Sequence, residues 1–190
     1  VKVSEIAIIG MDNQVLKFKN LAPTIAWDKI EFFNESLKTG TITYITQTAK
    51  QAEGLIDRDR VTGDTVWGGQ DGVSSFNVMF TFSDLRNISS CDFYFLQNRE
   101  EYWPQEMDLF LGETTDDVMK ENAQPTYTFK NGPTNGEYHF DSVPRLVRCV
   151  RLRFKNISPK LKDIYETVNI AFTEVSFNGT AVKGMQRSDD

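Results

Sequence analysis

Apolar residues alternate with polar ones along much of the chain, which is the period of two expected for strands with one buried face. The clearest runs of this kind cover residues 76–82, 91–95, 107–111, 127–129, 138–140 and 147–154. In the last run the phase slips between Cys149 and Val150, which is typical of a β-bulge. Short apolar runs separated by Gly, Asn and Asp predict an all-β protein built as an antiparallel sandwich.

Helical and disulfide signals are weak. One short segment, residues 115–122, has a helical pattern. Cys91 and Cys149 both lie in apolar strand patterns, which favours buried free thiols. A disulfide between them would need Cα atoms within about 7 Å, and the sequence does not specify that separation.

The chain has 190 residues and a formal net charge of -6, which fits one generous domain. This acidic balance argues against nucleic-acid binding, because a nucleic-acid binder needs Lys and Arg gathered on one face. No apolar run is long enough to span a bilayer, so we expect no membrane insertion. No signal-peptide pattern is present, and the start at Val1 indicates a mature fragment or an excised part of a longer chain.

Catalytic chemistry is restricted by one histidine and two cysteines, which exclude a two-histidine zinc site and a zinc ribbon. Around His139 the alternation places Tyr138 and Phe140 on one face and Glu137, His139 and Asp141 on the other. A solvated imidazole on the outer face of a strand is therefore favoured over a catalytic base. No nucleophile-elbow, phosphate-loop or dinucleotide-binding motif occurs, and we predict that this chain is not an enzyme.

Three stretches, in order, resemble the coagulation-factor type C (discoidin-like) domain and the family-32 carbohydrate-binding modules. Residues 54–59 with Thr65-Val66-Trp67 are similar to the family's L-I-D-G-D…T-x-W segment, although Arg58 replaces its glycine. Residues 147–156 are similar to its R-Y-V-R-L strand, and residues 172–179 to its closing A-E-I-E-F-Y-G strand. The resemblance implies a jelly-roll, galactose-binding-domain-like sandwich over residues 36–180, with a structural calcium and a ligand site on the loops at one end.

The segments outside this module divide into residues 1–35 and a tail, 181–190. Residues 4–10 echo residues 173–179, which predicts the end of a preceding module followed by a connector; a chance match between two strands is the alternative. The connector is too apolar for a free linker, so we expect it to pack on the sandwich.

A calcium site is predicted in the loop after residue 56. Asp57, Asp59, Asp64 and Thr65 supply the hard oxygen donors that calcium prefers. Glu174 shares alternation parity with Phe172, which predicts an inward carboxylate in need of a metal or another partner. The alternative is an Asp-rich turn neutralised by Arg58 and Arg60.

A carbohydrate site is expected where the resemblance places the family's ligand-binding arginine. The candidate residues in that loop and the next are Asn98, Arg99, Tyr102, Trp103 and Tyr165. Trp103 offers an aromatic face for a sugar ring, or else it anchors the loop from beneath. The family's histidine after the T-x-W tryptophan is missing, since Gly68 follows Trp67, and this argues against strict galactose specificity.

These observations favour a non-catalytic module that tethers a larger secreted or cell-surface bacterial protein, such as a glycoside hydrolase, to glycans. The expected ligands are galactose-like or N-acetylhexosamine sugars, and the expected cofactor is a structural calcium. The alternative is a structural or protein-interaction sandwich that has lost sugar binding.

Overall fold

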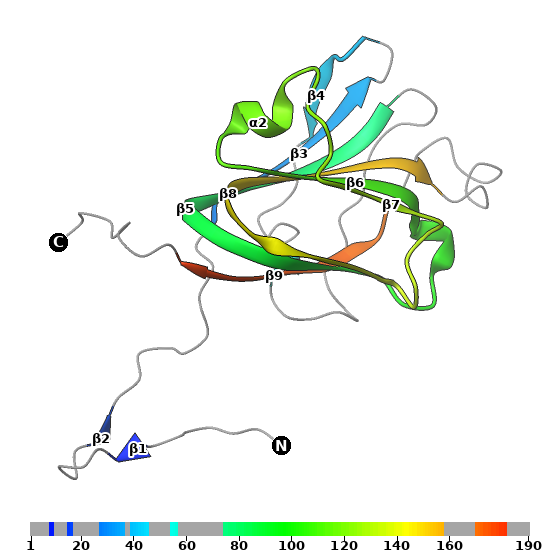
Figure 1. Cartoon of the computed structure of the whole chain (residues 1–190). Coiled ribbons are helices and arrows are strands. Elements are labelled where there is room, and N and C mark those ends of the chain that lie inside the picture. Colours follow the sequence, from blue (N-terminus) through cyan, green and yellow to red (C-terminus); the bar gives the residue numbers. More distant parts are fainter. Residues whose placement is uncertain are drawn as a thin grey trace.

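The structure is a computed structural model that describes residues 8–9, 15–16, 27–36, 39–45, 54–56, 74–157 and 170–181. Two short strands, β1 (Ile8–Ile9) and β2 (Val15–Leu16), pair antiparallel. The other elements, drawn in Figure 1, are β3 (Trp27–Ser36), β4 (Ile42–Ile45), β5 (Ser74–Phe95), η1 (Glu100–Tyr102), β6 (Pro104–Gly112), α2 (Thr115–Met119), β7 (Tyr127–Lys130), β8 (Glu137–Ile157) and β9 (Phe172–Ala181).

These strands form an antiparallel sheet in the order β4-β3-β5-β8-β6-β7, with β9 paired to β5. The first part of β5 pairs with β3 and the end of β8, whereas its second part pairs with β9 and the start of β8. The long strands β5 and β8 therefore run through both layers of the structure in Figure 1. The prediction of an all-β antiparallel sandwich is confirmed.

Several runs that look separate in the sequence are single bent strands. Residues 76–82 and 91–95 both belong to β5, and residues 138–140 and 147–154 both belong to β8. The bend lies where the register between these strands shifts, between Thr81 and Arg86. On β8 this shift falls between Val147 and Cys149, whereas Cys149 and Val150, where the sequence pattern predicted the slip, pair regularly with Thr81 and Phe80.

Phenylalanine dominates the core between the layers. Phe93, Phe95, Phe154 and Phe172 are all within 1% of full burial, and their rings meet at tilted or edge-on angles with centroids 5.4–6.5 Å apart. Such offset geometries are the favoured ones for aromatic pairs. Cys91 lies in this main core, and burial raises the pKa of its thiol.

A second apolar cluster lies on the opposite side of the sheet, beneath α2. Its buried members are Phe33, Met79, Phe110, Val118 and Cys149. Because Cys91 and Cys149 belong to different clusters, both are free, as predicted. The predicted helix is present but ends at Met119, and its start is capped by reciprocal hydrogen bonds between Thr114 and Asp117.

The end of the segment expected to be a connector is a strand of the sheet, β3. Residues 27–35 do not lie on the sandwich as a packed connector; they are an internal strand that pairs with β5 on one side and β4 on the other. The boundary expected before residue 36 therefore falls inside β3. Val1 to Gly10 lie outside the described residues except for β1. Among the described helices, none is long and apolar enough to cross a membrane.

His139 lies on the outer face of β8, as predicted, with its side chain 53% exposed. Its Nδ1 contacts the Asp92 carboxylate on the neighbouring strand, and its Nε2 lies 2.7 Å from Asp141 Oδ2. Hydrogen bonds to Asp92 and then Asp141 raise the pKa of His139 to about 9.

We expect this pairing to make stability depend on pH. A base whose pKa is raised in the folded state stabilises the fold fully below its unfolded pKa of about 6.5 and loses that contribution as the pH rises through about 9. Solvent screening of the exposed ring keeps the loss below about 1 kcal/mol. Urea unfolding at about pH 6 and pH 10 should show the loss in the wild type and a smaller one in His139→Gln. Equal losses in both proteins would contradict this assignment.

Candidate ligand-binding loops and a buried polar network

Three segments meet at one end of the sandwich. The chain after β5 is joined to the β7–β8 turn by the hydrogen bond from Phe95 N–H to the Gly136 carbonyl, 2.8 Å. It is joined to the start of β9 by hydrogen bonds from Leu96 N–H to the Ala171 carbonyl and from Ala171 N–H to the Tyr102 carbonyl. The loop predicted to bind sugar therefore lies beside the β7–β8 turn and the entry to β9.

Arg99 is exposed in this loop, but its guanidinium already has partners. Its Nε donates to Glu101 Oε1 at 2.6 Å, and its Cζ lies 4.7 Å from the centre of the Tyr102 ring. The hydrogen bond to Glu101 raises the pKa of Arg99. The exposed arginine and the half-buried glutamate and tyrosine form one group at the surface, with a positive charge, a carboxylate and a phenol side by side.

Trp103 anchors the loop. Its indole N–H donates to the Leu96 carbonyl at 2.8 Å, and the ring packs against the main core. A Cβ built on Gly136, which has a φ of +76°, would lie 3.3 Å from the indole. Glycine at 136 thus allows both the left-handed turn and the close approach of the tryptophan.

Asparagines line the same end of the sandwich. Asn98, Asn131 and Asn135 all have positive φ, a conformation that asparagine tolerates better than most residues. Asn131 and Asn135 belong to the β7–β8 turn and were not among the residues predicted from the sequence. The two Asn-Gly pairs in that turn were the available signal, because Asn-Gly marks tight turns whose side chains are exposed.

The predicted calcium ligands are described only in part. Asp57, Asp59, Asp64 and Thr65 lie outside the described residues, as does Tyr165 of the predicted sugar site. The residues just before Asp57 are described, and the Leu55 carbonyl accepts a hydrogen bond from Val175 N–H at 2.8 Å. The loop that carries the aspartates therefore starts next to β9.

Glu174 is buried, but it does not point into the core as its alternation with Phe172 predicted. The register between β5 and β9 shifts between Phe172 and Glu174, which reverses the parity. Glu174 lies opposite Tyr94, while its neighbour Val175 belongs to the main core. Glu174 as a whole is 5% exposed, so it is buried without belonging to the main core cluster.

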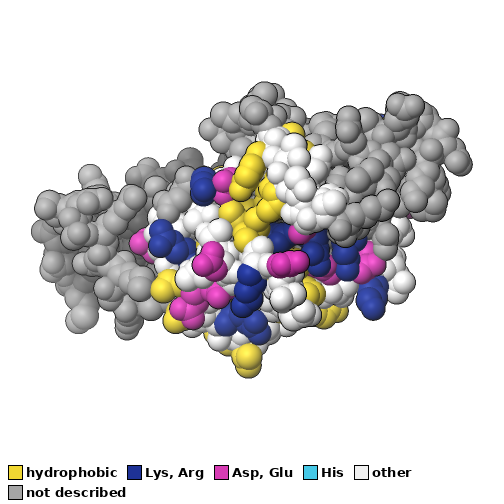
Figure 2. Space-filling view, turned by 90° about the horizontal axis from the view of Figure 1, so that it is seen from above, with side chains coloured by type: hydrophobic (Ala, Val, Ile, Leu, Met, Phe, Trp, Pro, Cys, Tyr) yellow, Lys and Arg dark blue, Asp and Glu magenta, His cyan; other side chains and the backbone are white. Residues whose placement is uncertain are grey.

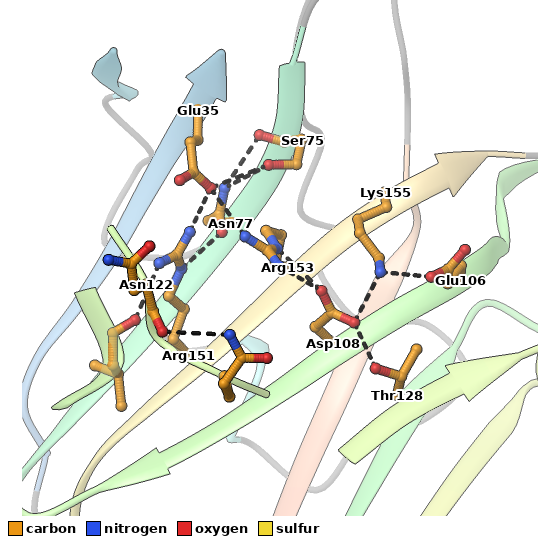
Figure 3. Close-up of polar contacts among 12 residues, drawn as sticks. Glu35, Ser75, Asn77, Glu106, Asp108, Asn122, Thr128, Arg151, Arg153 and Lys155 are labelled. Atoms are coloured by element: carbon orange, nitrogen blue, oxygen red, sulfur yellow. Dashed lines mark hydrogen bonds and ion pairs between the residues drawn. The ribbon is translucent and has the colours of Figure 1, made fainter. Parts of the chain in front are cut away.

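A polar network crosses the other layer, on the side that carries α2 (Figure 3). Arg151 is 2% exposed, and its Nε donates to Asn77 Oδ1 at 2.9 Å and its Nη1 to the Val118 carbonyl at 3.0 Å. Its Nη2 contacts the Glu35 carboxylate. One side chain therefore joins β8 to β5, to the end of α2 and to β3.

The network continues across β6. Arg153 Nη2 and Lys155 Nζ approach the two oxygens of Asp108 at 2.7 and 2.9 Å, and Lys155 also pairs with Glu106. Burial alone would raise the pKa of Asp108, but hydrogen bonds from Lys155, Arg153 and Thr128 hold it below its usual value. Figure 2 shows that acidic and basic side chains also lie next to one another on the surface in that view, beside hydrophobic ones.

Comparison with known proteins adds to this geometry. No protein-family model and no curated protein matches the sequence. The paired CBM32-1 and CBM32-2 domains of Clostridium perfringens ZmpB match the structure with a TM-score of 0.54 and 15% identity, over 80% of this chain and 34% of that chain. The same domains in complex with GalNAc match at 0.53 and 15%, over 80% and 32%.

A putative alpha-L-fucosidase from Bacteroides thetaiotaomicron also matches, with a TM-score of 0.52 and 15% identity, over 80% of this chain and 28% of that chain. This chain has the fold of the family-32 carbohydrate-binding modules. Two of the three stretches that resemble the family in sequence are strand segments of this chain. Residues 147–156 lie in β8, and residues 172–179 lie in β9. The chain spans about a third of the length of the ZmpB structure.

Proposed function

We propose that this chain is a non-catalytic carbohydrate-binding module that binds glycans through the loops at the end of the sandwich defined by residues 96–103 and 131–136. The observation that carries the proposal is the CBM32 fold together with the convergence of these loops. The proposed ligand is an N-acetylhexosamine or galactose-like sugar, because the similar ZmpB domains were solved with GalNAc. The module would tether a larger secreted or cell-surface bacterial protein to its glycan.

The exposed groups of these loops suit a sugar. Amide side chains at Asn98, Asn131 and Asn135 donate and accept hydrogen bonds, as hydroxyl and acetamido groups require. Arg99 adds a planar fork of donors, and the exposed part of Tyr102 adds an aromatic surface. Tyr165, six residues before Ala171, is proposed to approach from the loop that leads into β9.

Arg99→Ala should abolish binding of N-acetylhexosamine and galactose glycans on an array while leaving the melting temperature unchanged. Lost hydrogen bonds to sugar hydroxyls reduce affinity, whereas an exposed ion pair contributes little to stability. Lys120→Ala, a substitution at a charged residue near α2, is the matched control and should bind as the wild type does. A wild-type protein that binds no glycan, or an Arg99→Ala variant that binds normally, would contradict the proposal.

We further propose a structural calcium held by Asp57, Asp59 or Asp64, Thr65 and backbone carbonyls. Two observations support this proposal. The loop supplies the carboxylate and hydroxyl oxygens that calcium prefers. The hydrogen bond from Val175 N–H to the Leu55 carbonyl holds the residues just before the loop next to β9. Glu174, buried near that hydrogen bond, is the proposed ligand from β9.

Exhaustive chelation should then lower the melting temperature, because a metal that binds only the folded state stabilises it. Returning calcium should restore the transition, whereas returning magnesium should restore less, since magnesium demands a tighter octahedral site. An unchanged melting curve together with no metal by elemental analysis would exclude the site.

A second candidate function is a protein-interaction sandwich without sugar binding. It is favoured by the ion pair that occupies Arg99 and by the hydrogen bond that holds Trp103 to the loop backbone. A Glu101→Gln variant that gained glycan binding would show that the ion pair competes with sugar. No glycan signal in either protein would favour the interaction module.

A further inference from the structure

Among the described strands, β4 forms one end of the sheet order and β7 the other, while β9 pairs with β5 off this path. An edge strand presents unpaired backbone N–H and C=O groups, which pair readily with another strand. Proteins usually protect such edges with charged residues or proline. The described edges of this sandwich differ in that protection.

Strand β7 contains Lys130 and follows Pro125, and the start of β8 carries Glu137, His139 and Asp141. Strand β4 has the sequence Ile-Thr-Tyr-Ile, without charge or proline, and every residue in it is β-branched or aromatic. The uncharged stretch is longer than the strand, because residues 39–49 contain no charged residue and no proline. This composition favours pairing with a further strand.

The side chains of β4 are also accessible. Tyr44 is 62% exposed although one side of its ring rests on Phe33, with 5.7 Å between the ring centres. Thr43 is exposed as well, while Ile42 packs partly against the second apolar cluster. Figure 1 places β4 at the rim of its layer, next to β3.

The register shows which backbone groups of β4 face outward. Ser36 N–H donates to the Thr41 carbonyl at 2.9 Å, and the next pairs along are Glu35 with Ile42 and Asn34 with Thr43. Hydrogen-bonded and non-hydrogen-bonded pairs alternate in an antiparallel ladder. The backbone groups of Thr41 and Thr43 therefore bond to β3.

By the same alternation, the N–H and C=O groups of Ile42 and Tyr44 point away from β3. An antiparallel partner strand would use these two residues as its hydrogen-bonded positions. Residue 43, midway between them, would then face its partner in a non-hydrogen-bonded pair, where opposing side chains come closest.

We propose that β4 pairs antiparallel with β4 of a second copy of this chain, about a two-fold axis beside Thr43. Ile42 of each copy then exchanges both backbone hydrogen bonds with Tyr44 of the other, which gives four bonds. The side chains are self-complementary, since isoleucine meets tyrosine on one face and threonine meets threonine on the other. Aromatic–β-branched and Thr–Thr pairs are favourable cross-strand neighbours, and no like charges oppose each other.

The proposed dimer is weak, because pairing two short strands buries little surface. Stable protein complexes usually bury at least about 1,200 Å² in total. We expect a dissociation constant between about 10 μM and 1 mM. Sedimentation equilibrium of the full chain over this range should show the weight-average mass rising from monomer toward dimer.

Thr43→Lys and Thr43→Glu should each weaken dimerisation by at least about tenfold, because like charges then face each other across the axis. An equimolar mixture of the two variants should regain it, since a lysine then meets a glutamate. Gln124→Lys, which changes the charge at an exposed position between α2 and β7, should dimerise as the wild type does. Circular dichroism establishes that each variant is folded.

Amide hydrogen exchange of the wild type gives a second measurement at the interface. Raising the concentration should protect the N–H groups of Ile42 and Tyr44, while Thr43, bonded to β3, is protected at every concentration. A wild type that stays monomeric up to about 1 mM would overturn the proposal. So would a dimer that Thr43→Lys does not weaken, or one that leaves the two amides unprotected.

Discussion

Arg151→Ala is expected to lower the free energy of unfolding by about 3–5 kcal/mol, the usual cost of removing one partner from a buried charge network. The guanidinium touches four elements, and its loss leaves Asn77 Oδ1 and the Val118 carbonyl without the donor that Arg151 supplies. It also removes the cation from the rings of Phe33 and Phe110, which lie 5.5 and 5.1 Å from its Cζ. Urea unfolding monitored by tryptophan fluorescence measures the change.

Two further variants test the cause. Arg145→Ala removes the same charge from an exposed position of the same strand and should change stability by less than about 0.5 kcal/mol. Arg151→Lys keeps the charge but loses the planar fork, so it should lie between the wild type and the alanine variant. The assignment is wrong if Arg151→Ala is as stable as Arg145→Ala.

Deleting residues 1–35 is expected to prevent cooperative folding. The deletion removes nearly all of β3, including Phe32 in the main core and Phe33 in the second cluster. It also removes Glu35, the carboxylate that forms an ion pair with the buried Arg151. Truncating a buried phenylalanine costs about 3–5 kcal/mol, so losing two consumes most of the about 5–15 kcal/mol that stabilises a typical domain.

The matched control is a protein that begins at residue 27 and so keeps β3 whole. Thermal unfolding should show a sharp transition for this protein and none for the longer deletion, which should also bind a dye for exposed apolar surface. Residues 27–35 would be dispensable if both truncated proteins melted alike.

Sequence periodicity predicted the strands with one buried face, such as residues 137–141, where the buried Tyr138 and Phe140 alternate with exposed polar residues. Burial on one side produces this alternation directly. It missed β3 as a strand because both faces of β3 are buried. Phe32 packs in the main core and the adjacent Phe33 in the second cluster, so apolar residues stand next to each other. A strand covered on both faces loses its period of two.

The site was less predictable than the fold, since its properties depend on contacts between distant segments. The sequence indicated Arg99 and Trp103, but the hydrogen bonds that engage them and the neighbouring asparagine turn are tertiary features. Arg151 was concealed for a related reason. Alternation placed it on the polar face of β8, and only the cover provided by α2 and β3 makes that face a buried one.

The two bent strands determine how quickly this chain can fold. Strand β5 pairs with β8 through partners that include Phe76 with Phe154 and Tyr94 with Glu137, and the whole of β6, α2 and β7 lies between them in the sequence. Neither layer can form from neighbouring residues alone, because each contains a stretch of this distant pairing. The entropy of closing that long loop is lost before most of the core is buried, which gives folding times of milliseconds to seconds rather than microseconds.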